Sequence, residues 1–231
     1  WKLFKGNKLK SFQFYSRYLL NRLYNMMRKF YVILSFLFSV FFFSQEFKWG
    51  MTGNVHSSSI EGIHDFSRGR IAPSLGFFAE IPLETFQRSI YSPLRYYIFP
   101  VLEYSMEGEK TILEQGRQYY RNDFVALALY GKFHFYRGFF ENFYFMVGPR
   151  AAYAVSVDFK GPVINYESGP LGDDVTKKWS FSASSAFGYV VSDKMEVYIR
   201  YDHGLTKVYP NYDYRRTWNR LLGIGVSYYF N

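Results

Sequence analysis

Asp202 and His203 are adjacent in the segment YDHGL, and Ser105 and Ser156 lie in other segments that could approach them. A serine nucleophile, a histidine base and a carboxylate are the groups that catalyse acyl transfer. Successive residues of a strand point to opposite faces, so Asp202 and His203 cannot both face one site in a regular strand. We therefore predict no catalytic residues, and a hydrolase is the least favoured of three interpretations.

The histidines do not show the spacing of a metal site. They are His56, His64, His134 and His203. His56 and His64 fall in one predicted loop and could bind a metal ion weakly. The chain has no cysteine, which excludes a disulfide framework and a cysteine-ligated zinc or iron–sulfur site. We predict neither a metal site nor a cofactor.

Charged residues also occur on one face of several alternating segments. This set comprises Glu80, Glu103, Lys132, His134, Arg150, Glu196, Arg200 and Asp202. If these segments are strands around a narrow interior, the charges must pair, because an isolated buried charge is very costly. We predict a salt-bridged network that fills the interior. The alternative is that the same residues form a gate or line a thin passage for ions.

Eight segments show the alternation of apolar and small or polar residues that is typical of strands. They are 46–55, 70–81, 95–106, 119–135, 142–157, 178–191, 194–206 and 219–230. The connections between them alternate between a longer set and a shorter set. The longer ones are 56–69, 107–118, 158–177 and 207–218, and the shorter ones are 82–94, 136–141 and 192–193. Long outer loops and short periplasmic turns alternate in this way in outer-membrane barrels, although 82–94 is longer than expected.

The bulky face of these strands is too apolar and too aromatic to meet water. Aromatic residues make up 23% of the chain. In FVALALYGKFHF, Val125, Leu127 and Leu129 share one face, while Ala126 and Ala128 lie on the other. A bulky face can meet lipid, and small residues fit a narrow interior. Both features suit a closed barrel, because an unpaired backbone group is very unfavourable in lipid. A secreted soluble sandwich or lipocalin-like barrel is the alternative.

Aromatic residues near the predicted strand ends suit the interfaces between lipid and water. We assign Trp49, Tyr96, Tyr228 and Phe230 to these interfaces.

The net charge of +9 does not indicate a nucleic-acid partner, because it comes from the N-terminal region. Residues 1–44 contain basic residues and no acidic ones, so the remainder is nearly neutral.

The segment MRKFYVILSFLFSVFFFSQE has the basic start and the apolar run of a secretory signal. Its run of about 15 apolar residues is too short for a membrane-spanning helix. We predict an upstream extension over 1–26, a cleavable signal peptide over 27–45 and a barrel over 46–231; a retained anchor is the alternative.

Several segments resemble the PorT-like outer-membrane β-barrel family of Bacteroidetes. They are GFFAEIPL, FPVLEYSMEG, FVALALYGKFHF, FYFMVGPRAAY, IRYDHGLTKVY and GIGVSYYF, within residues 70–231. The resemblance implies the fold and the location, and because it rests on strand patterns and turn glycines it says little about activity. One member of the family is implicated in protein secretion and gliding. His203 departs from the neutral or small residue more usual there, and we do not transfer the secretion role.

The predicted fold class is therefore all-β, an eight-stranded antiparallel transmembrane β-barrel preceded by a cleavable signal peptide. We expect it in the outer membrane of a Gram-negative bacterium, with a non-enzymatic structural or interaction role and a largely plugged lumen. A narrow porin-like channel is the second interpretation and a lipid-modifying hydrolase the third. The expected partners are outer-membrane lipid, the barrel-assembly machinery during insertion, and envelope proteins that contact the outer loops; nucleic acid is not expected.

Overall fold

The computed structural model of the chain describes residues 47–61, 67–83, 93–113, 116–160, 177–208 and 217–231. These residues belong to one compact unit, Glu46–Asn231. The predicted extension over 1–26, the predicted signal peptide over 27–45 and His64 lie outside the described residues. No helix among the described residues is long and apolar enough to cross a membrane.

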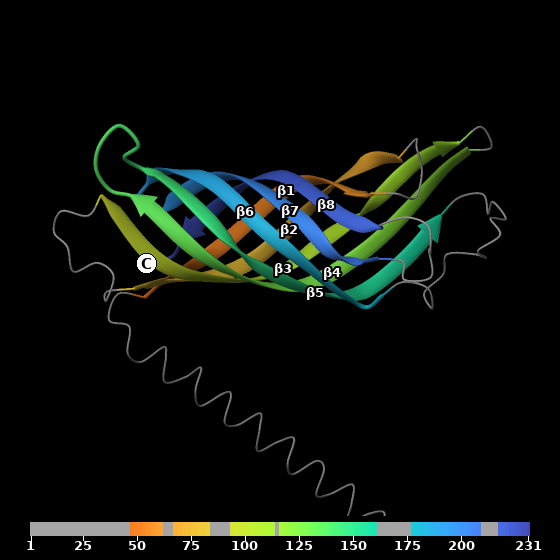
Figure 1. Ribbon diagram of the computed structural model, residues 1–231, viewed down its shortest axis with the longest axis horizontal. Helices are drawn as coiled ribbons and strands as arrows, with labels where there is room; N and C mark the ends of the chain where they lie inside the picture. Colours follow the sequence, from red (N-terminus) through yellow and green to blue (C-terminus); the bar gives the residue numbers. More distant parts are fainter. Residues whose placement is uncertain (1–46, 62–66, 84–92, 114–115, 161–176, 209–216) are drawn as a thin grey trace, which may run out of the picture. The chain divides into compact units, whose positions relative to one another are not determined.

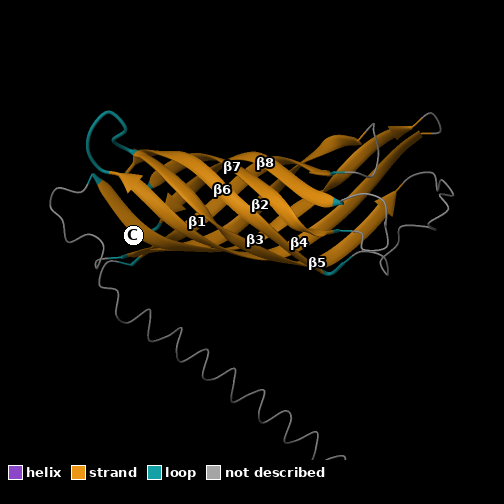
Figure 2. Cartoon of the chain, viewed as in Figure 1, coloured by secondary structure: helices purple, strands orange, loops and turns teal. Residues whose placement is uncertain are grey.

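The described chain forms eight strands that close into a barrel (Figures 1 and 2). The strands are β1 (Lys48–Ile60), β2 (Ser67–Pro82), β3 (Leu94–Leu113), β4 (Gly116–Phe135), β5 (Phe143–Lys160), β6 (Trp179–Ser192), β7 (Met195–Lys207) and β8 (Trp218–Tyr229). Each strand pairs antiparallel with the next one in the sequence, and β8 pairs with β1. The predicted closed, eight-stranded antiparallel barrel is therefore confirmed.

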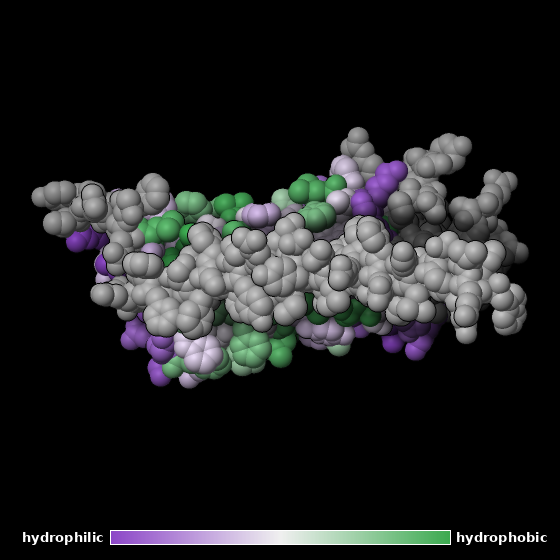
Figure 3. All heavy atoms as spheres, turned by 90° about the horizontal axis from the view of Figure 1, so that it is seen from below, coloured by the Kyte–Doolittle hydropathy of each residue, from purple (hydrophilic) through white to green (hydrophobic). Residues whose placement is uncertain are grey.

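Side chains alternate between the interior and the outer surface along the strands, with an interruption at Val155 and Ser156 of β5, where the register shifts. In β6, Trp179 and Phe181 are exposed, whereas Ser180, Ser182 and Ser184 are buried. Among the coloured residues of Figure 3, hydrophobic ones lie mostly in the middle part of the length of the barrel and strongly hydrophilic ones lie towards its two ends. A surface of this kind is stable only where its middle part is surrounded by lipid.

The two ends of the barrel differ. One end, which we call the turn end, carries the start of β1, the end of β8 and the short turns 136–142 and 193–194. The other end, the loop end, carries the β3–β4 connection. There the β3–β4 hairpin extends beyond the neighbouring strands (Figure 1).

Several strands continue farther towards the loop end than the sequence indicated. β1 reaches Ile60 and β3 reaches Leu113, so the predicted loops 56–69 and 107–118 are wrong over much of their length. The reason is backbone pairing: Met106 to Leu113 pair residue by residue with Gly116 to Asp123. Beyond the lipid a strand faces water on its outer side, and it can therefore be as polar and as rich in glycine as a loop.

Tyrosine rings fill the space above two inward-facing glycines. Tyr144 lies directly opposite Gly188, and Tyr198 lies directly opposite Gly225. A Cβ atom added to Gly225 would lie 2.3 Å from the Tyr198 ring, and one added to Gly188 would lie 2.2 Å from the Tyr144 ring. The small inner face of β8 thus makes room for a ring from the neighbouring strand.

We expect Gly225→Ala to destabilise the barrel by about 1–3 kcal/mol, because the added methyl group must displace the Tyr198 ring. That ring is fixed by a hydrogen bond of 2.7 Å between the hydroxyl groups of Tyr198 and Thr52. The free energy of unfolding in urea, measured in lipid vesicles, checks the effect. Gly53→Ala is the control, because a Cβ atom there would meet only a Leu75 methyl group at 3.9 Å. Equal stability of the two variants would contradict the close packing at Gly225.

Candidate functional site in the barrel interior

Two ion-pair clusters cross the interior, with a layer of aromatic and apolar side chains between them. The Arg cluster lies nearer the loop end and comprises Glu103, Glu107, Arg150, Arg200 and Asp202. The Lys cluster lies nearer the turn end and comprises Glu80, Lys132, Glu196 and Tyr229. Every member of both clusters is buried.

Glu103 is the centre of the Arg cluster. The Arg200 guanidinium binds it through two parallel hydrogen bonds, from Nη1 to Oε2 and from Nη2 to Oε1, each 2.7 Å long. The Nε of Arg150 donates to the same Oε1 at 2.9 Å. This two-bond geometry is among the strongest that a carboxylate forms, and it fixes the orientation of Arg200. A single carboxylate from β3 therefore binds arginines from β5 and β7.

Further contacts connect the Arg cluster to neighbouring strands. Arg200 Nη2 also donates to Asp202 Oδ2 at 2.7 Å, and the Ser184 hydroxyl donates to Asp202 Oδ1. Arg150 Nη2 donates to Glu107 Oε1 at 2.5 Å. The network therefore links β3, β5, β6 and β7 across the interior, which restricts their movement relative to one another.

In the Lys cluster one ammonium group binds two carboxylates. Lys132 Nζ lies 2.6 Å from Glu80 Oε2 and 2.6 Å from Glu196 Oε1. It also donates to the Tyr229 hydroxyl at 3.0 Å, and that hydroxyl donates to Glu80 Oε2 at 2.8 Å. The Nζ atom also lies 4.4 Å from the centre of the Tyr144 ring. These contacts connect β2, β4, β7 and β8 close to the turn end.

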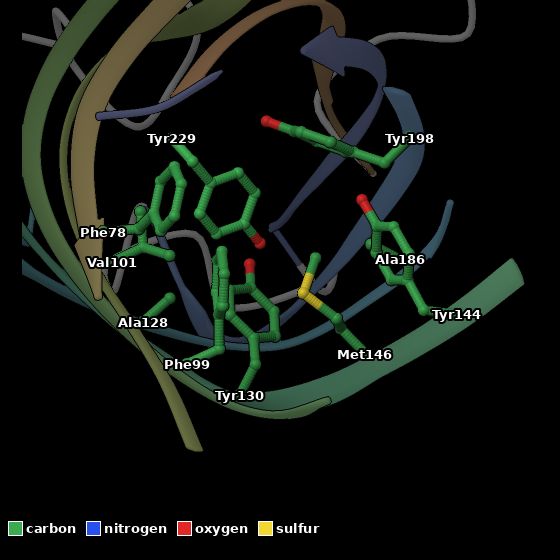
Figure 4. Close-up of a cluster of buried hydrophobic side chains, with 10 residues drawn as sticks. All are labelled: Phe78, Phe99, Val101, Ala128, Tyr130, Tyr144, Met146, Ala186, Tyr198 and Tyr229. Atoms are coloured by element: carbon green, nitrogen blue, oxygen red, sulfur yellow. The ribbon is translucent and has the colours of Figure 1, made fainter. Parts of the chain in front are cut away.

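The layer between the two clusters is made largely of rings that point into the barrel (Figure 4). Phe78 stacks on Phe99 at 4.7 Å, and its edge contacts Tyr229 at 4.9 Å. A cavity about the size of one water molecule lies beside Tyr198 and Arg200. The interior is thus packed with side chains through the middle of the barrel.

All the charged residues predicted for the lumen except His134 belong to these clusters. His134 is half-buried near the turn end of β4. Its ring lies 6.4 Å from that of Tyr136, and none of the ion pairs between described residues includes it. Its neighbour across the β3–β4 pair is Arg95, another basic residue, and its place in the ion-pair network stays a prediction.

The sequence prediction missed Glu107, Tyr229 and the buried Glu109. Glu107 and Glu109 were placed in a loop, although they continue the alternation of Glu103 and Ser105. Extending that period of two past residue 106 would have identified them. The described interior contains six buried carboxylates and three buried cations. The sequence prediction had included only four of these carboxylates. The carboxylates are Glu80, Glu103, Glu107, Glu109, Glu196 and Asp202, and the cations are Lys132, Arg150 and Arg200.

The groups considered for acyl transfer do not converge. Asp202 is inside the barrel and bound by Arg200, whereas His203 contacts the Tyr201 hydroxyl at 3.2 Å on the other face of β7. Ser105 is buried inside, and Ser156 is exposed. In this arrangement the four residues cannot act on one substrate.

His56 is not a loop residue. It lies in β1 with its side chain buried, 3.1 Å from Asn54 Oδ1 and 2.9 Å from the backbone oxygen of Met106. The predicted loop shared with His64 is therefore wrong at His56. The described part of the chain brings together no group of three histidine or acidic side chains that could hold a metal ion.

The aromatic residues assigned to the interfaces lie near the turn end. The rings of Trp49 and Phe230 meet edge to face at 4.7 Å, and Phe230 lies 6.0 Å from Tyr228. Tyr96 contacts Phe133 at 5.6 Å. Trp49, Tyr228 and Phe230 are exposed on the outer surface, in the position of an aromatic belt.

A closed barrel with an apolar outer surface and a polar, packed interior defines a transmembrane β-barrel. Residues 43–210 match the family described as the outer membrane protein beta-barrel domain. The chain belongs to this family, and its predicted location in the outer membrane of a Gram-negative bacterium is confirmed. By the usual topology of such barrels, the turn end faces the periplasm and the loop end faces outwards.

Solved structures of small outer-membrane proteins are similar to the chain. Ail, the attachment invasion locus protein of Yersinia pestis, has 8% sequence identity over 81% of this chain and 99% of its own, with a TM-score of 0.42. Neisserial surface protein A has 12% identity over 79% and 96%, with a TM-score of 0.38. OprG from Pseudomonas aeruginosa has 10% identity over 80% and 94%, with a TM-score of 0.35. No curated protein sequence matches the chain.

Proposed function

We propose that this outer-membrane barrel has a non-enzymatic structural or interaction role and that its lumen is closed to solutes. The observation that carries the proposal is the sequence of three packed layers along the lumen: the Arg cluster, the aromatic layer and the Lys cluster. A conducting pore needs a continuous path for water, and the cavity beside Tyr198 and Arg200 in the aromatic layer has room for about one water molecule.

The clusters suit a plug because each charged group in them has a partner. Moving Arg200 or Lys132 aside to open a path would leave buried carboxylates without a counter-charge, which is strongly unfavourable. Thermal motion of a single side chain is therefore insufficient to open the lumen. The function then depends on the outer surface and the loop end, where envelope proteins can bind.

Single-channel recording tests the plug. We expect the protein, purified from outer membranes and inserted into a planar bilayer, to give no steady openings, because neither the Arg cluster nor the Lys cluster can open without separating ion pairs. A shift of the folded band on heating, seen on an electrophoresis gel, must first show that the inserted protein is folded. Reproducible openings of the folded wild type would contradict the proposal.

A narrow channel is the second candidate, and one observation favours it. The described interior contains more carboxylates than cations, as in a pore that selects positive ions. If openings occur in the recording above, their reversal potential in a salt gradient should therefore indicate cation selectivity. An anion-selective conductance would exclude the lumen carboxylates as the lining of the path.

The absence of catalysis is part of the proposal. It is supported by the separation of Asp202, His203 and the two serines on different faces of the strands. Incubation of the folded protein with radiolabelled phospholipid and lipopolysaccharide should release no fatty acid. Release that is lost in Ser105→Ala or Ser156→Ala would contradict this point and favour a lipid-modifying hydrolase.

We also propose that the chain belongs to the PorT-like branch of Bacteroidetes barrels. The motifs that suggest this branch lie in the halves of β2, β4 and β5 nearer the turn end, in the middle of β3, and in the paired strands β7 and β8. The interactions expected during and after insertion, with the barrel-assembly machinery and with outer-membrane lipid, follow from the same class. An alignment that groups the chain outside the PorT-like sequences would contradict this placement.

A further inference from the structure

The outward face of β3, β4 and β5 changes character towards the loop end. Tyr104, Val125 and Tyr153 lie opposite one another on these strands and form an exposed, mainly apolar row. Beyond this row β3 continues to Leu113 and β5 to Lys160. A strand needs only about ten residues to cross the hydrocarbon, and β3 has 20, so its outer part lies above the lipid core.

Cations gather on this outer part because of the strand register. Lys110 of β3 is directly opposite Tyr119 of β4, and Tyr119 is directly opposite Lys160 of β5. Directly opposite residues share a face of the sheet. Lys110 Nζ lies 5.7 Å from the centre of the Tyr119 ring, and the Arg121 guanidinium lies 6.0 Å from it. We call the surface formed by Lys110, Tyr119, Arg121 and Lys160 the cationic face. A further exposed cation, Arg68 of β2, lies directly opposite Lys110.

The positive charge of the cationic face is only weakly compensated. Asp158, opposite Arg121, lies 3.5 Å from Lys160, but the two side chains are 44% and 60% exposed. Water screens an exposed pair of this kind, so it leaves most of the field of Lys160 in place. Asp123 lies nearer the lipid and accepts a hydrogen bond of 3.0 Å from the Tyr104 hydroxyl. Among the described residues, the face can therefore attract an anion.

The height of the cations above the lipid indicates which anion. A strand advances about 3.4 Å per residue. Measured along the strands, Arg121 therefore lies roughly 14 Å beyond the row formed by Tyr104, Val125 and Tyr153, and Lys110 lies roughly 20 Å beyond it. With a strand tilt of about 40°, they stand roughly 10–16 Å above it. Head groups of ordinary phospholipids occupy about 5–8 Å on each side of the hydrocarbon. The cations are thus above the phosphates of phospholipids and level with a larger, sugar-based head group.

We propose that the cationic face binds phosphate groups on the oligosaccharide head group of the outer-leaflet glycolipid, the class to which lipopolysaccharide belongs. Arginine and lysine both bind phosphate, and a phosphate can contact two of these side chains at once. The exposed Tyr104 and Tyr153 lie below the cationic face, at a level suited to the lipid–water interface. The proposal concerns the outer surface and does not depend on whether the lumen conducts.

Titration of the protein in an uncharged detergent with fluorescently labelled rough-type lipopolysaccharide, which carries a phosphorylated core, tests the proposal. The variant has Lys110→Gln, Arg121→Gln and Lys160→Gln together. The matched control carries Lys48→Gln, Arg137→Gln and Lys194→Gln, which remove three exposed cations at the opposite, turn end of the barrel. Fluorescence anisotropy should show roughly 100-fold weaker binding by the first variant and little change in the control. Equal weakening in both would overturn the proposal, since it would show attraction by total charge alone.

Two further titrations use the wild type and so do not depend on the folding of a variant. Removal of the phosphates from the lipopolysaccharide should weaken binding as much as the triple substitution does. Lipid A without its core should also bind weakly, because its phosphates lie at the depth of ordinary head groups. Unchanged binding in either titration would overturn the proposal. Displacement of the lipopolysaccharide by dextran sulfate at equal charge concentration would also overturn the proposal, because it would show that the cationic face binds soluble polyanions.

Discussion

Arg200→Ala is expected to lower the free energy of unfolding by about 3–5 kcal/mol, because it leaves two buried carboxylates without their main partner. Glu103 loses two hydrogen bonds of 2.7 Å, and Asp202 loses another of 2.7 Å. Arg150 retains its contact with Glu103, so the network is weakened rather than removed. Urea unfolding in lipid vesicles measures the loss, and the heat-induced shift of the folded band should occur at a lower temperature.

Arg220→Ala is the matched control for this prediction. Its guanidinium also forms an ion pair of 2.7 Å, with Glu61, but both side chains are more than 40% exposed. Exposed pairs contribute about 1 kcal/mol or less, so this variant should be close to wild type. Unchanged heat resistance of Arg200→Ala would contradict a plug held by the Arg cluster. Raised conductance of the same variant would instead favour a gate.

Lys132→Met is the second substitution for which we expect a large loss, again about 3–5 kcal/mol. It removes the one cation between Glu80 and Glu196, which then lie close together in a packed interior with no counter-charge. A methionine fills nearly the same volume as the lysine stem, so the loss reports on charge rather than on a cavity. The free energy of unfolding in urea is again the measurement.

A compensated variant separates charge from packing in the Lys cluster. In the triple substitution Lys132→Met, Glu80→Gln and Glu196→Gln, no charge is buried, and we expect most of the stability to return. If the triple variant is as unstable as Lys132→Met, the lysine contributes through its other contacts. The nearest of these are the Tyr229 hydroxyl and the ring of Tyr144.

The sequence predicted the fold well because the membrane imposes a simple rule on it. Each strand in lipid must expose bulky residues on one side, and this period of two is visible in segments such as FVALALYGKFHF. The rule applies only within the lipid. It therefore says nothing of Met106 to Leu113, which continue the β3 strand in polar surroundings and are stabilised by pairing with β4.

The sequence was sufficient to predict which charged residues line the interior, but not which of them contact one another. Strand parity alone placed Glu103 and Arg200 on one face, and burial required them to pair. Their bidentate contact depends on how β3 and β7, which are not neighbours in the sheet, face each other across the barrel. Parity could also have identified Tyr229 as an inward residue. Its hydrogen bond to Glu80, however, depends on β8 closing beside β1 and β2.

The β1–β8 pairing determines when this barrel can be complete. It joins the first strand to the last, and the Trp49 amide binds the Asn231 side chain 182 positions away in the sequence. Until the last strand arrives, both flanking strands have unpaired edges, and contacts between such distant segments form slowly. Once closed, the sheet has no free edge from which strands can detach one at a time. We therefore expect the lifetime of the folded barrel to be set by a rare concerted opening along β1 and β8, even where its equilibrium stability is modest.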